Sequence, residues 1–177
     1  MRDEYTLYGV EGYYTRFGAH YRNPQEAAIT EALKQLNPKP CRVLDLACGS
    51  GEATLALRNL GFTNIIGIDP YTGEAYRQRT GQTALSITFE GIAAGLLAAR
   101  YDMVVCSFAL HLVEESRLPL LLWRLTQLAP RLVVISPIKR PPIEQFWRLK
   151  REFVVERVHL RDFESQTLNR SFGILIS

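Results

Sequence analysis

The sequence predicts an α/β fold in which helices cover both faces of an open, mostly parallel β-sheet. From residue 41 onward, short apolar segments alternate with helical segments, which is the pattern of strand–helix–strand units. The last two apolar segments are joined by a polar loop without a helix, and this predicts an antiparallel pair at the end of the sheet. The chain has 177 residues, of which 47% are hydrophobic. We therefore expect one globular domain, 1–177.

The first 40 residues are expected to form an N-terminal arm and the first helix, ahead of a sheet core at 41–177. A helix is predicted over 24–36 because Asn23 can cap it and Pro24 suits its first position. Two prolines follow and end this helix. The arm at 5–22 is rich in aromatic residues and has no clear periodicity, which favours an irregular segment or a short lid helix.

The sheet core is predicted to contain five parallel strands before the antiparallel pair. The parallel strands are expected at 42–46, 63–69, 85–90, 101–107 and 131–136, and the final pair at 153–159 and 171–176. Helices are expected at about 52–60, ending at Gly61, and at about 115–129, where leucines recur on one face. Nearly continuous apolar strands are typical of strands that are covered on both faces.

The charge and cysteine content exclude several classes of protein. Lysine and arginine number 21 against 18 aspartate and glutamate, a net charge of +3 that is too small to indicate a nucleic-acid binder. Cys41, Cys48 and Cys106 match no zinc or disulfide spacing, so we expect reduced thiols and no metal. The N-terminus lacks the features of a signal peptide, and the most apolar region, 91–113, is interrupted by charged residues. We expect a soluble, cytoplasmic protein without a membrane partner.

Polar residues and glycines gather where the predicted parallel strands end, the edge at which open α/β sheets bind ligands. There, Gly49 and Gly51 lack a Cβ, which lets a ligand approach the backbone closely. Asp69 follows Asp45 by 24 residues, near the spacing at which such folds place an acid on ribose hydroxyls. Because a carboxylate accepts both hydrogen bonds of a cis-diol, this combination predicts a ribose-bearing cofactor.

The residues around the glycine turn disfavour a dinucleotide. The dinucleotide fingerprint would need a glycine where this chain has Thr54. Asp45 at the end of the strand would also repel a pyrophosphate. A cofactor without phosphate, carrying an ammonium or a sulfonium, fits better. A nicotinamide-dependent oxidoreductase is therefore a disfavoured alternative.

Four segments together resemble the class I S-adenosylmethionine-dependent methyltransferases. They are VLDLACGSGEAT at 43–54, IIGIDPY at 65–71, YDMVVCSFALHLV at 101–113 and RLVVIS at 131–136. The resemblance implies a Rossmann-like, seven-stranded sheet of order 3-2-1-4-5-7-6, in which strand 7 is antiparallel. It also implies S-adenosyl-L-methionine as the cofactor, S-adenosyl-L-homocysteine as its product, and transfer of a methyl group to an acceptor.

The resemblance implies roles for individual residues around this cofactor. The residues expected at the methionine moiety are Asp45, Ala47, Cys48, Gly49 and Gly51. Those expected around the ribose and adenine are Asp69, Pro70, Tyr71, Glu90, Gly91 and Ile92. Those expected at the face of methyl transfer are Ser107 and Phe108. Family members often carry an acid where this chain has Ile92, so the adenine amino group is expected to contact Glu90 or backbone carbonyls.

The N-terminal arm resembles the cofactor lid of small family members. Its candidate cofactor contacts are Tyr14, Tyr21 and Arg22. Aromatic faces attract a cation by about 0.5–2 kcal/mol per contact, and Arg22 would neutralise the carboxylate of the cofactor. Plain packing of the aromatic side chains against the sheet is the alternative.

The candidate base for methyl transfer is His111, which follows the predicted strand at 101–107, and His20 in the arm is the second choice. The basic residues within 139–157 would suit an acidic substrate or an RNA backbone, but interleaved acids favour a solvated surface. A small-molecule acceptor is expected. An RNA or protein acceptor is one alternative, and a non-catalytic partner or activator domain of the same fold is another.

Overall fold

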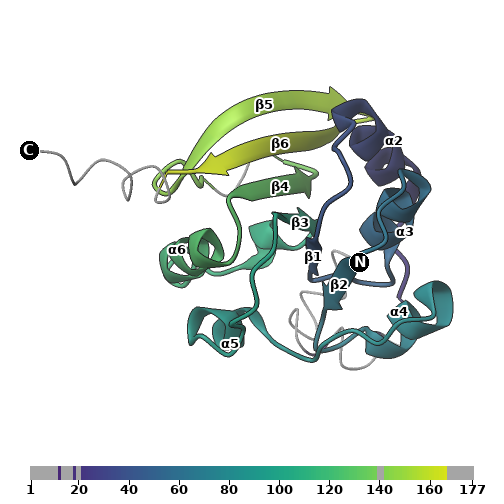
Figure 1. Ribbon diagram of the computed structural model, residues 1–177, viewed down its shortest axis with the longest axis horizontal. Coiled ribbons are helices and arrows are strands. Elements are labelled where there is room, and N and C mark those ends of the chain that lie inside the picture. The colour runs from purple at the N-terminus through teal and green to yellow at the C-terminus, as the bar shows by residue number, and fades with distance from the viewer. Residues whose placement is uncertain (1–11, 13–17, 19–20, 139–141, 167–177) are drawn as a thin grey trace, which may run out of the picture.

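The computed structural model describes residues 12, 18, 21–138 and 142–166. Figure 1 shows a twisted central sheet with helices on both sides of it. The elements are, in chain order, α2 (Glu26–Leu36), β1 (Val43–Leu46), α3 (Glu52–Asn59), β2 (Ile65–Ile68), α4 (Gly73–Thr80), α5 (Phe89–Ala93), β3 (Met103–Ser107), η2 (Leu110–Leu112), α6 (Leu118–Leu128), β4 (Arg131–Ser136), β5 (Trp147–Val155) and β6 (Val158–Ser165). The predicted alternation of strands and helices is therefore confirmed.

The six described strands form one mixed sheet in the order β2-β1-β3-β4-β6-β5. The four strands from β2 to β4 are parallel, and β6 runs antiparallel to both β4 and β5. All four residues of β1 are buried, as are the four from Met103 to Cys106 in β3. This burial is expected of central parallel strands, because helices cover both of their faces.

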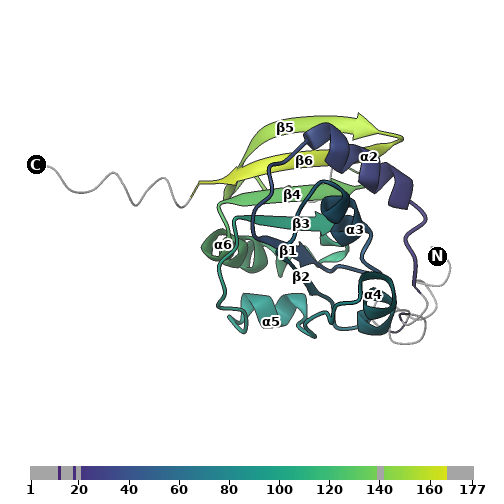
Figure 2. The same cartoon turned by 45° about the vertical axis from the view of Figure 1, so that its right-hand side comes forward.

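Two layers of helices cover the sheet, and each builds its own part of the core. On one face, α2 and α3 pack their buried residues against β1, β3 and β4. On the other face, α5 and α6 pack theirs against the same strands and against Trp147 and Phe163 of the last two strands. Figure 2 shows these two layers on opposite sides of the sheet. The described part of the chain contains no helix with the length and apolar character that a membrane crossing requires.

The predicted third strand at 85–90 is not formed, so the structure does not confirm a count of seven strands. Only Leu85 pairs with the sheet, as a single parallel bridge to Ile68. The chain then turns into α5, where Thr88 Oγ1 accepts a hydrogen bond from the backbone N–H of Gly91 at 3.1 Å. Threonine is a good helix cap, and this local signal outweighs the β-propensity of a segment at the edge of the sheet.

The end of the chain forms a hairpin, and its boundaries differ from the prediction. A strand was expected through 153–159, but the structure turns at Glu156 and Arg157, whose φ angles are 47° and 71°. Only the end of strand β5, at 153–155, lies within that expected strand; the rest of β5 was not expected, because most side chains of this edge strand are exposed. The antiparallel end of the sheet is confirmed. The predicted strand at 171–176 lies outside the described residues.

Candidate functional site

A cavity of about 390 Å³ opens at the edge of the sheet where β1, β2 and β3 end. Leu46 aligns with Ile68 and with Cys106, so the residues that follow these strands meet at this edge. The predicted site residues that line the cavity are Tyr21, Ala47, Cys48, Gly49, Asp69, Pro70, Tyr71, Glu90, Ser107 and Phe108. Those that the structure does not bring to its wall are Arg22, Asp45, Gly51, Gly91, Ile92 and His111. Tyr14 and His20 lie outside the described residues.

The glycine turn after β1 has a backbone conformation that disfavours bulky side chains. Ala47, Gly49 and Gly51 have φ angles of 55°, 56° and 92°. A Cβ added at Gly49 would lie 3.1 Å from Cε1 of Tyr21, so the bare turn lets this ring approach it. A Cβ at Gly51 would lie 2.5 Å from Cγ2 of Thr80 in α4. Gly51 is thus required for the packing of α3 against α4, which explains its place behind the cavity wall.

Asp69 is held at the cavity by backbone N–H groups. Its Oδ1 accepts hydrogen bonds from the backbone N–H groups of Tyr71 and Thr72, at 2.8 and 3.0 Å. Its Oδ2 accepts from the N–H of Gly49 at 3.2 Å, which joins the end of β2 to the glycine turn. The residue is 8% exposed and lines the cavity. A carboxylate fixed in this way is preorganised to accept hydrogen bonds from a ligand.

Asp45 lies behind the cavity wall, where it is completely buried. Its Oδ2 accepts a hydrogen bond of 2.6 Å from Thr54 Oγ1, which lies 3.1 Å from the hydroxyl of Tyr76. Burial raises the pKa of Asp45 to about 7, against the lowering effect of the Thr54 hydrogen bond. Its Oδ1 has no hydrogen-bond partner among the described residues. Asp45 was expected at the methionine moiety of a cofactor, but the structure places it behind the cavity wall, hydrogen-bonded to Thr54 of α3.

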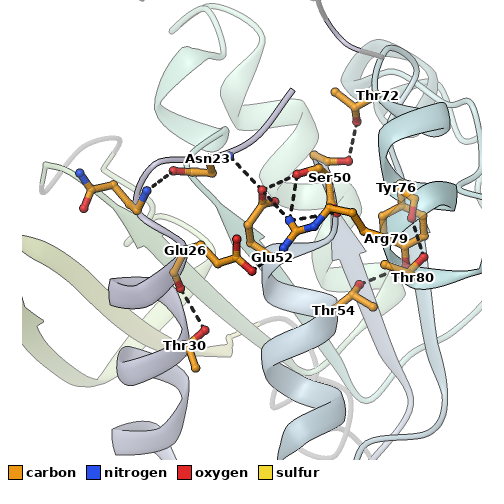
Figure 3. Close-up of polar contacts among 12 residues, drawn as sticks. Asn23, Glu26, Thr30, Ser50, Glu52, Thr54, Thr72, Tyr76, Arg79 and Thr80 are labelled. Atoms are coloured by element: carbon orange, nitrogen blue, oxygen red, sulfur yellow. Dashed lines mark hydrogen bonds and ion pairs between the residues drawn. The ribbon is translucent and has the colours of Figure 1, made fainter. Parts of the chain in front are cut away.

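Glu52 was not expected at the site, yet it lines the cavity from the first turn of α3. Its Oε1 accepts hydrogen bonds from the backbone N–H of Asn23, from Ser50 Oγ and from Arg79 Nη1. Arg79 also forms an ion pair with Glu26 of α2. Figure 3 shows this network joining α2, the glycine turn and α4. An acid directly after the second glycine is the sequence signal for Glu52, but acids are common in first turns of helices.

A chain of surface charges joins α5 to the segment before α6 on the cavity wall. Arg117 Nη1 donates to Glu90 Oε1 at 2.7 Å, and Arg117 Nε lies 3.1 Å from Glu114 Oε2. Hydrogen bonding from backbone N–H and from Arg117 lowers the pKa of Glu90. Glu90 therefore stays charged on this wall. The neighbouring Ile92 is buried in the core between α5 and the sheet, which explains its absence from the cavity.

The part of the cavity near the ends of β3 and η2 is mainly apolar. The apolar side chains that line it are Phe89, Phe108, Ala109, Leu112 and Val113. Phe108 has a φ of 55°, an unfavourable conformation for a bulky residue. Such strain is concentrated at ligand sites, where the surrounding structure maintains it. The cavity can thus hold a ligand with a polar part beside Asp69 and Glu52 and an apolar part beside Phe108.

His111, the predicted base, lies in η2 and does not line the cavity. Its Nδ1 is buried and has no hydrogen-bond partner among the described residues. Burial lowers the pKa of His111, so the imidazole is neutral at pH 7. Arg22, expected at a cofactor carboxylate, is exposed and also lies away from the cavity wall.

Comparisons with known proteins show the family of this chain. A family model described as a methyltransferase domain matches residues 18–169. An uncharacterized protein of Schizosaccharomyces pombe is 30% identical over 230 aligned positions, which cover 95% of this chain and 93% of the relative.

Solved structures share the fold at low sequence identity. One is the N-methyltransferase NodS from Bradyrhizobium japonicum in complex with S-adenosyl-L-homocysteine, with a TM-score of 0.63 and 15% identity over 81% of this chain and 89% of that chain. Another is magnesium protoporphyrin IX methyltransferase from Synechocystis with bound S-adenosylmethionine, with a TM-score of 0.58 and 18% identity over 93% of each chain.

Proposed function

The chain belongs to the methyltransferase domain family, and we propose that it transfers the methyl group of S-adenosyl-L-methionine to a small-molecule acceptor. One observation supports this proposal most strongly. A single cavity has Gly49 and Asp69 in one part of its wall and the apolar side chains around Phe108 in another. Methyl transfer needs two adjoining regions of this kind, one for the cofactor and one for the acceptor.

The residues at the first region fit the cofactor. Asp69 lines the cavity, and three backbone N–H groups fix its carboxylate. It can therefore accept hydrogen bonds from the hydroxyls of a ribose. Gly49 lines the cavity, and the ring of Tyr21 packs where a Cβ of this residue would lie. A volume of about 390 Å³ is within the usual range for small-molecule sites.

The protein's contribution to the reaction is positioning. The bound cofactor supplies a methyl group that its positive sulfur already activates. The apolar walls at Phe108, Leu112 and Val113 exclude water and hold an acceptor in line with that methyl group. Alignment of this kind contributes roughly 7–11 kcal/mol to catalysis. Because His111 does not line the cavity, we propose that the reaction needs no contribution from this side chain.

The charges on the last strands favour a small molecule over an RNA acceptor. Arg148 and Lys150 lie 3.7 Å or less from Glu164, and Arg151 lies 3.6 Å from Asp162. Basic side chains that are paired with acids leave little net positive potential for a phosphate backbone. The basic residues of this region, for which interleaved acids favoured a solvated surface, are thus partly neutralised in the described part of the chain.

Calorimetry on the purified chain tests the cofactor assignment and separates it from the alternatives. We expect heat of binding with S-adenosyl-L-methionine and with S-adenosyl-L-homocysteine, and none with NAD. Binding of NAD alone would point to an oxidoreductase. Binding of the sulfonium cofactor, followed by no methyl transfer to any of a broad panel of small-molecule, RNA and peptide acceptors, would favour the non-catalytic partner domain.

A further inference from the structure

One acidic side chain faces the cavity from a position that the glycine motif does not assign. Glu52 begins α3, directly after Gly51, and is 3% exposed. It lines the cavity together with Gly49 and Asp69. Burying a carboxylate is costly unless it is paired or hydrogen-bonded. The hydrogen bonds of its two oxygens therefore indicate which oxygen stabilises the protein and which is available to a ligand.

The first oxygen, Oε1, is fully occupied by the protein. It accepts from the backbone N–H of Asn23 at 2.9 Å, from Ser50 Oγ, and from Arg79 Nη1 at 3.2 Å. Arg79 is itself held by an ion pair with Glu26, which fixes the guanidinium between two acids. These contacts come from the segment before α2, from the glycine turn and from α4. They fix the orientation of the Glu52 carboxylate.

The second oxygen, Oε2, has no hydrogen bond among the described residues and lies against the glycine turn. A Cβ built at Gly49 would be 3.3 Å from this oxygen. Oε2 thus lies beside Gly49, and both Gly49 and Glu52 line the cavity. Two acids, Glu52 and Asp69, and one arginine, Arg79, lie around this turn, so the local charge favours a cationic group.

We propose that Glu52 Oε2 binds the α-ammonium group of the cofactor's methionine end. This inference rests on the proposed function and assigns a specificity-determining residue to its cofactor site. Asp45, the acid expected in that role, is buried behind the wall with its Oδ2 bonded to Thr54. Glu52 supplies the negative charge at the wall itself. Arg79 acts through Glu52 as a positioning residue.

The test compares two ligands that differ at the methionine end. S-Adenosyl-L-homocysteine carries the ammonium group, and 5′-methylthioadenosine lacks the whole amino-acid part. For Glu52→Gln, calorimetry is expected to give about 10- to 100-fold weaker binding of S-adenosyl-L-homocysteine, because one charge-assisted hydrogen bond is lost. Binding of 5′-methylthioadenosine is expected to stay within about threefold of wild type. Glu74→Gln, the same change on the exposed surface of α4, is the matched control and is expected to alter neither affinity.

The outcomes separate this inference from the proposed function. If wild type binds neither ligand, the proposed function fails. If wild type binds both and Glu52→Gln weakens them equally, or weakens neither, the assignment of Glu52 is overturned. Should Glu52→Gln fail to fold by circular dichroism, wild type is titrated with the deaminated analogue of S-adenosyl-L-homocysteine. A loss of about 10- to 100-fold supports ammonium recognition, and unchanged affinity overturns it.

Discussion

Asp45 and Asp69 lie at the ends of neighbouring strands, and the structure gives them different surroundings. Asp69 lines the cavity, whereas Asp45 is buried behind the cavity wall and hydrogen-bonded to Thr54. The spacing of the two acids located Asp69 correctly at the cavity. It could not tell which way Asp45 points, because every residue of β1 is buried and no solvent-facing side is visible in the pattern. Glu52 was missed because an acid in a first helical turn has an ordinary structural explanation.

Asp69→Asn is expected to weaken S-adenosyl-L-homocysteine binding by about 10- to 100-fold, because a neutral amide forms weaker hydrogen bonds with ribose hydroxyls. Titration calorimetry measures the change, with Glu74→Gln as the surface control. An unchanged affinity would show that the ribose does not lie at Asp69.

The buried carboxyl of Asp45 predicts a pH dependence of stability. Its pKa is raised to about 7 in the native state, so between about pH 4 and pH 7 the native protein holds a proton that the unfolded chain has released. The free energy of unfolding therefore falls as pH rises through this window, by on the order of 4 kcal/mol. Asp45→Asn removes this contribution. Urea unfolding at several pH values should show that the free energy of unfolding of wild type falls relative to that of Asp45→Asn as pH rises. A difference in unfolding free energy that does not change with pH would contradict this prediction.

His111 allows a test of whether a side chain removes a proton from the acceptor. Its place outside the cavity wall predicts that His111→Asn changes turnover by no more than about threefold, once an acceptor is known. Steady-state kinetics provides the measurement. A general base contributes about 10²- to 10⁴-fold. A loss of that size, with cofactor affinity preserved, would restore His111 as the base.

At the scale of elements, the apolar parallel strands were predictable, whereas most of the exposed strand β5 and the conformation of the segment at 85–90 were not. Strands β1, β2, β3 and β4 lie within the predicted apolar segments, because a strand covered on both faces is a continuous apolar run. The edge strand β5 is mostly exposed and charged, so it has no such run. The segment at 85–90 is apolar enough for a strand, but only its Leu85 pairs with the sheet.

The hairpin between β5 and β6 gives a prediction at this scale. Its turn places Glu156 and Arg157 at φ angles of 47° and 71°, in the left-handed region that side chains disfavour. Asparagine followed by glycine is the preferred pair for such a turn. The double substitution Glu156→Asn with Arg157→Gly should raise the free energy of unfolding by about 1 kcal/mol. Urea unfolding of both proteins measures this, and a decrease in stability would contradict the turn geometry.

At the scale of the whole molecule, the sheet topology brings the functional residues together. Parallel β1, β2 and β3 end at one edge, so a glycine turn, an acid and a strained phenylalanine that are far apart in sequence border one cavity. The network of Glu52, Arg79 and Glu26 then joins α2 to the glycine turn. This network could not be predicted from the sequence, because it depends on how three helices pack around the turn.

A crystal structure of the protein saturated with S-adenosyl-L-homocysteine tests the central claim most directly. We predict that the ligand lies in the cavity at the ends of β1, β2 and β3, with both ribose hydroxyls within hydrogen-bond distance of Asp69 and the methionine end beside Gly49. A cavity without ligand at saturating concentration, or a ligand bound elsewhere on the molecule, would contradict the assignment of this cavity as the cofactor site.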